Sequence, residues 1–185
     1  MSRLIMWNLI TLDGFFEGAK PWDLSFHDVV WGDELEKIGI EQTGSADGLV
    51  FGRATFEGMA AHWPTAKGPI AEIMNSIPKF VCSRTLQSVD WNNSTILSGD
   101  AADEVAKLKG AGSKDLLVFG SANLSETFTR NGLFDEVRLV VTPVILGSGK
   151  PLFGRDVPGP KLELLSSQRL KTGGVMVQYK PEENS

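Results

Sequence analysis

The chain has 185 residues, of which 42% are apolar and 22% charged, so it has the composition of an ordinary globular domain and not of a disordered segment. Its formal net charge is −5 and its basic residues are scattered, which argues against a surface that binds nucleic-acid phosphates. No apolar run is long enough to span a membrane, and the amino terminus lacks the pattern of a secretory signal, so we expect a cytoplasmic protein.

Length and cysteine content narrow the class further. We expect one domain over residues 1–185, large enough to bury roughly 70% of its unfolded surface. The single cysteine, Cys82, excludes an internal disulfide and any metal site built from several cysteines. We therefore expect no metal.

The first part of the chain predicts a buried strand, a long loop and a helix. Residues 3–10 are rich in Leu, Ile, Met and Trp and run into the turn Thr11-Leu12-Asp13-Gly14. Residues 15–27 carry aromatic side chains without a clear period, so we expect a packed loop of the kind that carries function. A helix is expected from Trp31 onward, with Asp33 and Glu34 in its first turn.

Two apolar strands run directly into a glycine and then into a helical pattern. Residues 49–51 lead into Gly52-Arg53-Ala54-Thr55, and residues 116–119 lead into Gly120-Ser121-Ala122-Asn123. Glycine allows a sharp turn, and the first free N–H groups of the following helix carry a positive partial charge. Such a helix start suits a phosphate group. Residues 79–82 read as a third strand, which ends at Ser83-Arg84.

The remaining pattern predicts a parallel α/β body with an antiparallel end. We expect helices at 70–77 and 101–110, strands at 94–97, 136–142 and 143–146, and an antiparallel hairpin formed by 162–164 and 175–179. Ligands of open α/β sheets lie beyond the carboxyl ends of the strands, so three strand ends with hydroxyl or arginine side chains point to one site. Taken singly, Gly52-Arg53 is better explained as an ordinary helix entry with a solvated arginine and Gly120-Ser121 as an ordinary turn, and Ser83-Arg84 alone is a weaker signal still.

Together these motifs resemble the dihydrofolate reductase-like proteins, and especially the reductase domain at the carboxyl end of bifunctional riboflavin-biosynthesis deaminase-reductases. The resemblance covers nearly the whole chain. It rests on Thr11-Leu12-Asp13-Gly14, Gly52-Arg53-Ala54-Thr55-Phe56-Glu57, Ser83-Arg84, Gly120-Ser121, Gly132-Leu133-Phe134-Asp135-Glu136-Val137, Pro143-Val144-Ile145-Leu146-Gly147-Ser148-Gly149 and Gly173-Gly174-Val175. It implies a mixed sheet, mostly parallel, with helices on both faces.

The resemblance also implies NADPH as hydride donor and a pterin-, flavin- or pyrimidinone-like substrate. The residues that match the pyrophosphate-binding helix start are Gly52, Arg53 and Thr55. Those that match the pair near the adenosine ribose and its 2′-phosphate are Ser83 and Arg84, and those that match the second glycine turn and helix start are Gly120, Ser121, Ala122 and Asn123. Proteins of this kind often pair, so we expect a homodimer.

Two positions depart from the riboflavin-pathway pattern. Trp7 stands at a position where those reductases share a lysine, and Phe119 stands at a position where they have a glutamate. A phosphorylated substrate would lose a cationic partner, whereas a flat, less polar ring could stack on either side chain. We therefore place Trp7 and Phe119 in the substrate site, with burial in the core as the alternative. We expect no deaminase activity in these residues, because neither His27 nor His62 begins an H-x-E pattern and one cysteine cannot supply the zinc ligands.

Asp13 ends a buried strand beside the expected cofactor cleft. One role is catalytic, in which it binds the substrate or relays the proton that hydride transfer requires; the other is to stabilise its turn. Two functions remain open for the chain as a whole: an NADPH-dependent reductase, or an NADPH-binding module without turnover.

Overall fold

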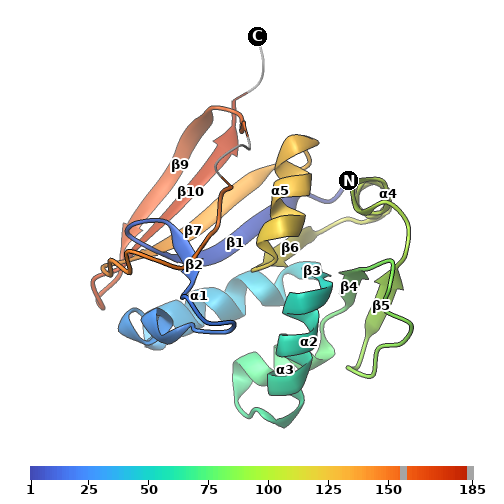
Figure 1. The fold of residues 1–185 in the computed structure, drawn as a ribbon, viewed down its shortest axis with the longest axis horizontal. Coiled ribbons are helices and arrows are strands. Elements are labelled where there is room, and N and C mark those ends of the chain that lie inside the picture. The colour runs from blue at the N-terminus through green and yellow to red at the C-terminus, as the bar shows by residue number, and fades with distance from the viewer. Residues whose placement is uncertain (155–157, 183–185) are drawn as a thin grey trace.

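The computed structural model describes residues 1–154 and 158–182 and shows a mixed α/β fold (Figure 1). The strands are β1 (Leu4–Thr11), β2 (Phe15–Glu17), β3 (Ala46–Gly52), β4 (Lys79–Cys82), β5 (Ser94–Leu97), β6 (Asp115–Phe119), β7 (Glu136–Thr142), β8 (Lys150–Pro151), β9 (Leu162–Arg169) and β10 (Val175–Pro181). The helices are α1 (Asp33–Gly44), α2 (Arg53–His62), α3 (Pro69–Ser76), α4 (Ala101–Ala111) and α5 (Ala122–Arg130), with two short 3₁₀ helices, η1 (Ser25–Val29) and η2 (Trp63–Thr65).

The main sheet has eight strands in the order β5-β4-β3-β6-β1-β7-β10-β9. The first six run parallel, and β10 and β9 join antiparallel at the end. A second, two-stranded sheet pairs β2 with β8. The predicted mixed sheet with an antiparallel carboxyl-terminal hairpin is therefore confirmed.

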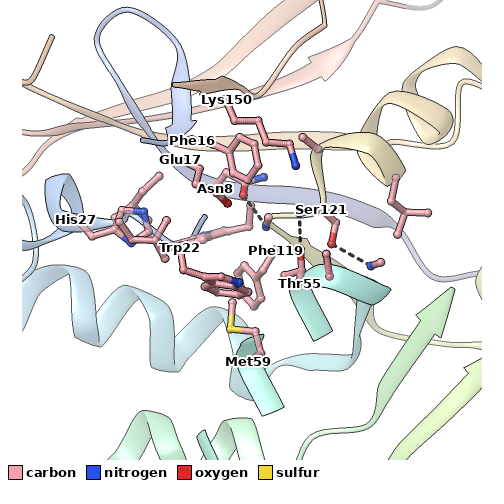
Figure 2. A pocket seen from close by; sticks show the side chains of 18 of the residues that line it. Asn8, Phe16, Glu17, Trp22, His27, Thr55, Met59, Phe119, Ser121 and Lys150 are labelled. Carbon is pink, nitrogen blue, oxygen red and sulfur yellow. Dashed lines mark hydrogen bonds between the residues drawn. The ribbon is translucent and has the colours of Figure 1, made fainter. Parts of the chain in front are cut away.

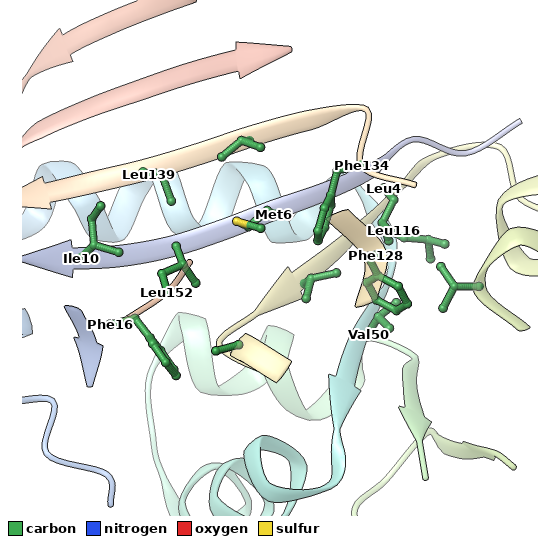
Figure 3. Packing of buried hydrophobic residues seen from close by; sticks show 14 of the residues in the cluster. Leu4, Met6, Ile10, Phe16, Val50, Leu116, Phe128, Phe134, Leu139 and Leu152 are labelled. Atoms are coloured by element: carbon green, nitrogen blue, oxygen red, sulfur yellow. The ribbon is translucent and has the colours of Figure 1, made fainter. Parts of the chain in front are cut away.

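Strand β1 lies inside the sheet, and all eight of its residues are buried. Successive side chains of a strand point to opposite faces. Leu4, Met6 and Ile10 pack with the cluster that α4 and α5 cover (Figure 3). Trp7 and Leu9 pack on the other face, toward α1, and the neighbouring cluster there includes side chains of α2 and α3. Apolar residues on both faces explain why the strand shows no polar alternation.

The parallel order brings the carboxyl ends of β3, β6 and β1 to the same edge of the sheet, since β6 lies between the other two. The turns that follow β3 and β6 are therefore neighbours, although 68 positions separate Gly52 from Gly120 in the sequence. This arrangement positions the candidate site.

Two sequence-based expectations differ from the structure. Residues 143–146 were expected to form a strand but form a loop, in which the Val144 carbonyl accepts a hydrogen bond from the Leu12 backbone N–H. Pro143 has no N–H to donate to a sheet, and this disfavours a regular strand there. The expected loop at 15–27 contains β2 and most of η1, because β2 finds a partner in β8, 133 positions further along from Glu17 to Lys150.

Strand β9 is an exposed edge strand at the outer end of the sheet (Figure 1). All eight of its residues are exposed, including three leucines, Leu162, Leu164 and Leu165.

The helices within residues 1–154 and 158–182 are each too short or too polar to cross a lipid bilayer.

Candidate active site

A cavity of about 630 Å³ lies beyond the carboxyl ends of β3 and β6 and alongside β1 (Figure 2). The two strand-end turns supply one end of it, which we call the polar end: Gly52, Arg53, Ala54, Thr55, Gly120, Ser121, Ala122, Asn123 and Leu124. The remaining lining residues form the other end, which we call the aromatic chamber: Trp7, Asn8, Leu9, Phe16, Glu17, Pro21, Trp22, Leu24, His27, Trp31, Gly39, Gln42, Thr43, Met59, Trp63, Ile70, Met74, Phe119 and Lys150.

Three hydrogen bonds join the strand ends at the polar end. The Gly120 N–H donates to Asn8 Oδ1 at 2.7 Å, the Ser121 N–H donates to Thr55 Oγ1 at 3.0 Å, and the Gly52 N–H donates to Ser121 Oγ at 3.0 Å. Figure 2 shows these contacts as dashed lines. Side chains on β1, α2 and the β6–α5 turn therefore hold the two turns in a fixed relative position.

Backbone conformation explains the glycine at position 120. Gly120 has φ +58°, and a Cβ placed there would lie 3.2 Å from Thr55 Cγ2. Ser121 is also left-handed, with φ +55°, a conformation that costs a non-glycine residue free energy. Its two hydrogen bonds, one through the N–H and one through the hydroxyl, compensate for that strain.

Both helices that start at the polar end lack a side-chain cap. The N-cap of α2 is Gly52, which has no side chain to offer, and the Ser121 side chain at the N-cap of α5 accepts no hydrogen bond from its own helix. The first N–H groups of both helices, with the positive end of each helix dipole, are thus available to an anion. Arg53 lines the same end, where its guanidinium pairs with Glu57 at 2.7 Å and donates to Thr85 Oγ1 at 3.0 Å. This donor set fits a phosphate or pyrophosphate group.

Ser83 and Arg84 lie at the end of β4, outside the residues that line the cavity. The Ser83 hydroxyl accepts from the backbone N–H groups of Thr85 and Leu86. The Arg84 side chain is 70% exposed and pairs with Asp100 at 3.2 Å. Since β4 neighbours β3, both residues share the edge of the sheet with the polar end without being part of the cavity.

The aromatic chamber holds four of the chain's five tryptophans: Trp7, Trp22, Trp31 and Trp63. Trp7 and Phe119 both line it, and their rings meet edge to face with centroids 5.3 Å apart. Trp7 is only 8% exposed and also belongs to a core cluster. Both side chains thus line the cavity and pack against the core as well.

Four buried polar atoms around the cavity have no hydrogen-bond partner among the described residues: Trp7 Nε1, Asn8 Nδ2, His27 Nε2 and Gln42 Oε1. Buried polar atoms in native proteins are normally hydrogen-bonded. Donors and acceptors of this kind fit a ligand with polar edges, such as a carboxamide or a heterocycle. Burial lowers the pKa of His27 to about 4, so its imidazole is neutral near pH 7.

Asp13 does not line the cavity. Its carboxylate accepts hydrogen bonds from Thr11 Oγ1 at 2.7 Å and from the backbone N–H groups of Leu146 and Gly147 at 3.2 and 2.7 Å. These bonds, the one from Thr11 first, lower the pKa of the carboxyl group. These bonds tie the turn after β1 to the loop at 146–147, as expected for the turn-stabilising alternative.

Several cavity residues carried no functional prediction. Asn8 had a readable signal, because it is a polar residue inside an otherwise apolar strand. Trp22, His27 and Glu17 had none, since they lie in a segment without periodicity. Glu17 carries the one carboxylate among the described residues that line the cavity, and Lys150 approaches the Phe16 ring centroid at 5.5 Å.

The fold and the paired strand-end turns agree with a comparison of the whole sequence, in which residues 3–176 match the RibD C-terminal domain family. The chain belongs to this family. The uncharacterized protein YyaP of Bacillus subtilis (strain 168) is 32% identical over 185 residues, which cover 96% of this chain and 94% of that protein. The resemblance to riboflavin-pathway reductases is therefore confirmed.

Solved structures show the same fold. A putative riboflavin biosynthesis protein from Shewanella sp. PV-4 superposes with a TM-score of 0.82 at 23% identity, covering 98% of this chain and 99% of that one. Dihydrofolate reductase from Enterococcus faecalis, complexed with NADP(H) and RAB-propyl, superposes with a TM-score of 0.66 at 12% identity, covering 98% and 97%. At these identities the likeness establishes a dihydrofolate reductase-like fold and not an activity.

Proposed function

We propose that this protein is an NADPH-dependent reductase that transfers a hydride to a flat heterocycle of the pterin, flavin or pyrimidinone type. The observation that carries the proposal is the pair of uncapped helix starts, α2 and α5, held side by side at one end of a cavity whose other end is aromatic. Membership of the RibD C-terminal domain family and the NADP(H) bound by the dihydrofolate reductase of the same fold support it.

In this proposal the polar end holds the cofactor pyrophosphate. The backbone N–H groups that follow Gly52 and Ser121 and the guanidinium of Arg53 bind its oxygens. Ser83 and Arg84, at the neighbouring strand end, bind the 2′-phosphate of the adenosine, for which Arg84 leaves its exposed pair with Asp100. When bound, NADPH supplies the hydride.

The charges around the cavity favour a substrate without a phosphate. Among the described lining residues, formal charges are carried by Glu17, Arg53 and Lys150. With Arg53 engaged at the polar end, Lys150 alone remains as a cation for the substrate. Trp7 and Phe119 present ring surface where the riboflavin-pathway reductases have charged side chains, so a less polar ring is the better match.

Hydride transfer to a C=N bond leaves negative charge on nitrogen, and a proton must arrive there. We assign that step to Glu17, which lines the cavity and holds the water that delivers the proton, and not to Asp13, whose carboxylate is occupied in its turn. The neutral imidazole of His27 contributes a hydrogen bond to the ring and no charge.

The quaternary proposal is a homodimer formed through β9. Its exposed leucines lie on an edge strand that pairs with a neighbouring strand on one side only among the described residues, and such edges are commonly covered in native proteins. Sedimentation at micromolar concentration is expected to give twice the monomer mass of 20.1 kDa for the wild type, and the monomer mass for Leu164→Glu. A monomeric wild type would remove the dimer from the proposal and leave the reductase untouched.

The functional test is turnover. Wild-type protein is mixed with NADPH and a panel of dihydropteridines, flavins and pyrimidinones, and the loss of reduced nicotinamide absorbance is followed. We expect at least one uncharged ring compound to support oxidation above background. If NADPH binds but no compound in the panel is reduced, the binding module without turnover replaces the reductase. The cavity of about 630 Å³ favours turnover, because the aromatic residues leave room beside the polar end.

A further inference from the structure

Trp22 sits at the tip of a closed loop between β2 and η1. The Gly18 N–H donates to the Asp23 carbonyl at 2.8 Å, and the Asp23 N–H donates to the Lys20 carbonyl at 3.1 Å. Trp22 itself has φ +63°, in the left-handed region. A bulky residue rarely adopts this conformation, which costs it free energy that glycine or asparagine would largely avoid.

The indole of Trp22 lies directly against the backbone of α2. A Cβ added to Gly58 would come within 1.8 Å of Trp22 Cζ2 and 2.1 Å of Cε2, so any larger residue at 58 would displace the ring. Figure 2 shows the Trp22 ring above the Met59 side chain, and both residues line the cavity. Met59 is held in turn, because its sulfur accepts a hydrogen bond from Trp63 Nε1 at 3.1 Å.

This contact covers the Trp22 indole only in part. Trp22 remains 43% exposed after packing on Gly58, so much of its apolar surface stays in water while its backbone stays strained. Strained residues of this kind cluster at ligand sites, where the surroundings hold them in place. A ligand that covers the exposed part of the indole would recover the apolar burial that folding leaves incomplete.

We propose that Trp22, seated on Gly58, is a specificity-determining wall of the aromatic chamber and stacks on an uncharged, flat polycyclic heteroaromatic ring. Trp7 and Phe119, whose rings already pack edge to face, line the same chamber. This inference rests on the proposed function in one respect: it takes the aromatic chamber as the substrate end of the cavity. Trp22 contacts the substrate and takes no part in proton or hydride transfer.

The test measures binding and not turnover. Lumichrome, an uncharged tricyclic heterocycle, and uridine 5′-monophosphate, a charged one-ring compound, are titrated into the wild type and variants, and NADPH is titrated in parallel. Gly58→Ala displaces the Trp22 ring without removing it, and alanine suits a helix interior. Trp22→Asn removes the ring but tolerates the left-handed backbone, and Trp22→Phe keeps a ring. Gly110→Ala, in α4 with open space around the added methyl, is the matched control for Gly58→Ala.

The wild type is expected to bind lumichrome at least about tenfold more tightly than uridine 5′-monophosphate. Gly58→Ala and Trp22→Asn should each weaken lumichrome about tenfold, with Trp22→Phe intermediate and Gly110→Ala unchanged. NADPH affinity and melting temperature should stay near wild type in all four variants. The inference on Trp22 is overturned if Gly58→Ala and Trp22→Asn bind lumichrome as tightly as the wild type does, or if the wild type does not bind lumichrome. In either case, NADPH binding by the wild type would leave the reductase proposal standing. If neither the wild type nor any variant binds NADPH, but the lumichrome affinities follow the expected order, the reductase proposal is refuted and the proposed role of Trp22 in ring binding stands.

Discussion

The two ends of the cavity are built in different ways. The polar end consists of two turns that each follow directly on a buried strand, and three hydrogen bonds fix them together. The aromatic chamber is assembled mainly from β1, β2, the strained loop before η1, three helices and η2, and it is lined by side chains from all of these elements. Backbone geometry therefore dominates at the polar end, whereas side-chain packing dominates in the chamber. We expect the polar end to tolerate few substitutions and the chamber to tune the choice of substrate.

The largest effect is expected beneath the aromatic chamber, at Lys79. Its side chain is fully buried, donates to the carbonyls of Asn75, Ile77 and Asn92, and lies 4.4 Å from the Trp91 ring centroid. It thereby holds the end of α3, which supplies two chamber residues. Burial lowers the pKa of Lys79 to about 8 from an ordinary 10.5.

Between these two pKa values the unfolded chain binds more protons than the folded one, so the free energy of unfolding rises with pH there. The rise is on the order of 3 kcal/mol. Urea unfolding of the wild type from pH 7 to pH 11 should show it, whereas Lys79→Met should lack this contribution. If the free energy of unfolding depends on pH in the same way in both proteins, burial does not lower the pKa of Lys79, and the Lys79 charge is not desolvated in the folded protein.

Next in size is the effect of a methyl group at the polar end. Gly120→Ala should cost about 1–2 kcal/mol of stability from its left-handed backbone and weaken NADPH about 100-fold, because the added Cβ pushes Thr55 out of its bond with Ser121. Gly132→Ala is the control, since Gly132 has φ +61° with open space around the added methyl. It should lose similar stability, as followed by chemical unfolding, and keep its NADPH affinity in a calorimetric titration. Equal losses of NADPH affinity in both variants would show that backbone strain alone, and not the geometry of the turn at Gly120, weakens cofactor binding.

Turnover separates Glu17 from Asp13. Glu17→Gln should lower turnover about 100-fold with little change in NADPH affinity, as expected when assistance to proton transfer is removed. Asp13→Asn should lower the melting temperature, because it weakens the hydrogen bonds to Thr11, Leu146 and Gly147, and leave turnover of the folded protein near normal. Steady-state rates for the two variants at saturating NADPH decide the assignment, and the reverse pattern would return the catalytic role to Asp13.

The smallest effects concern the two arginines. Arg53→Ala should weaken NADPH and NADH alike by about tenfold, because both cofactors carry the pyrophosphate. Arg84→Ala should weaken NADPH about tenfold and leave NADH nearly unchanged, because only NADPH has the extra phosphate. Equal losses of both cofactors in Arg84→Ala would assign Arg84 to folding or to the pyrophosphate.

The contrast between the two ends also explains what the sequence could predict. Gly52-Arg53 and Gly120-Ser121 follow their strands directly, so local patterns were enough to find both turns, and the parallel order of the sheet made them neighbours. Trp7 and Phe119 were found through their departure from the family pattern. Trp22 and Glu17 could not be found, because their positions depend on the pairing of β2 with β8 and on a glycine in α2, contacts that span distant parts of the chain.

The most direct test of the account is a titration of NADPH into the wild-type protein that records energy transfer from tryptophan to the reduced nicotinamide. Four tryptophans line the cavity, so a cofactor bound at the polar end with its nicotinamide toward the chamber lies close to all of them. We predict saturable transfer at micromolar NADPH, lost in Gly120→Ala and retained in Gly132→Ala. Absence of saturable transfer up to millimolar NADPH, in a protein that is folded, would contradict the cofactor site and with it the proposed reductase.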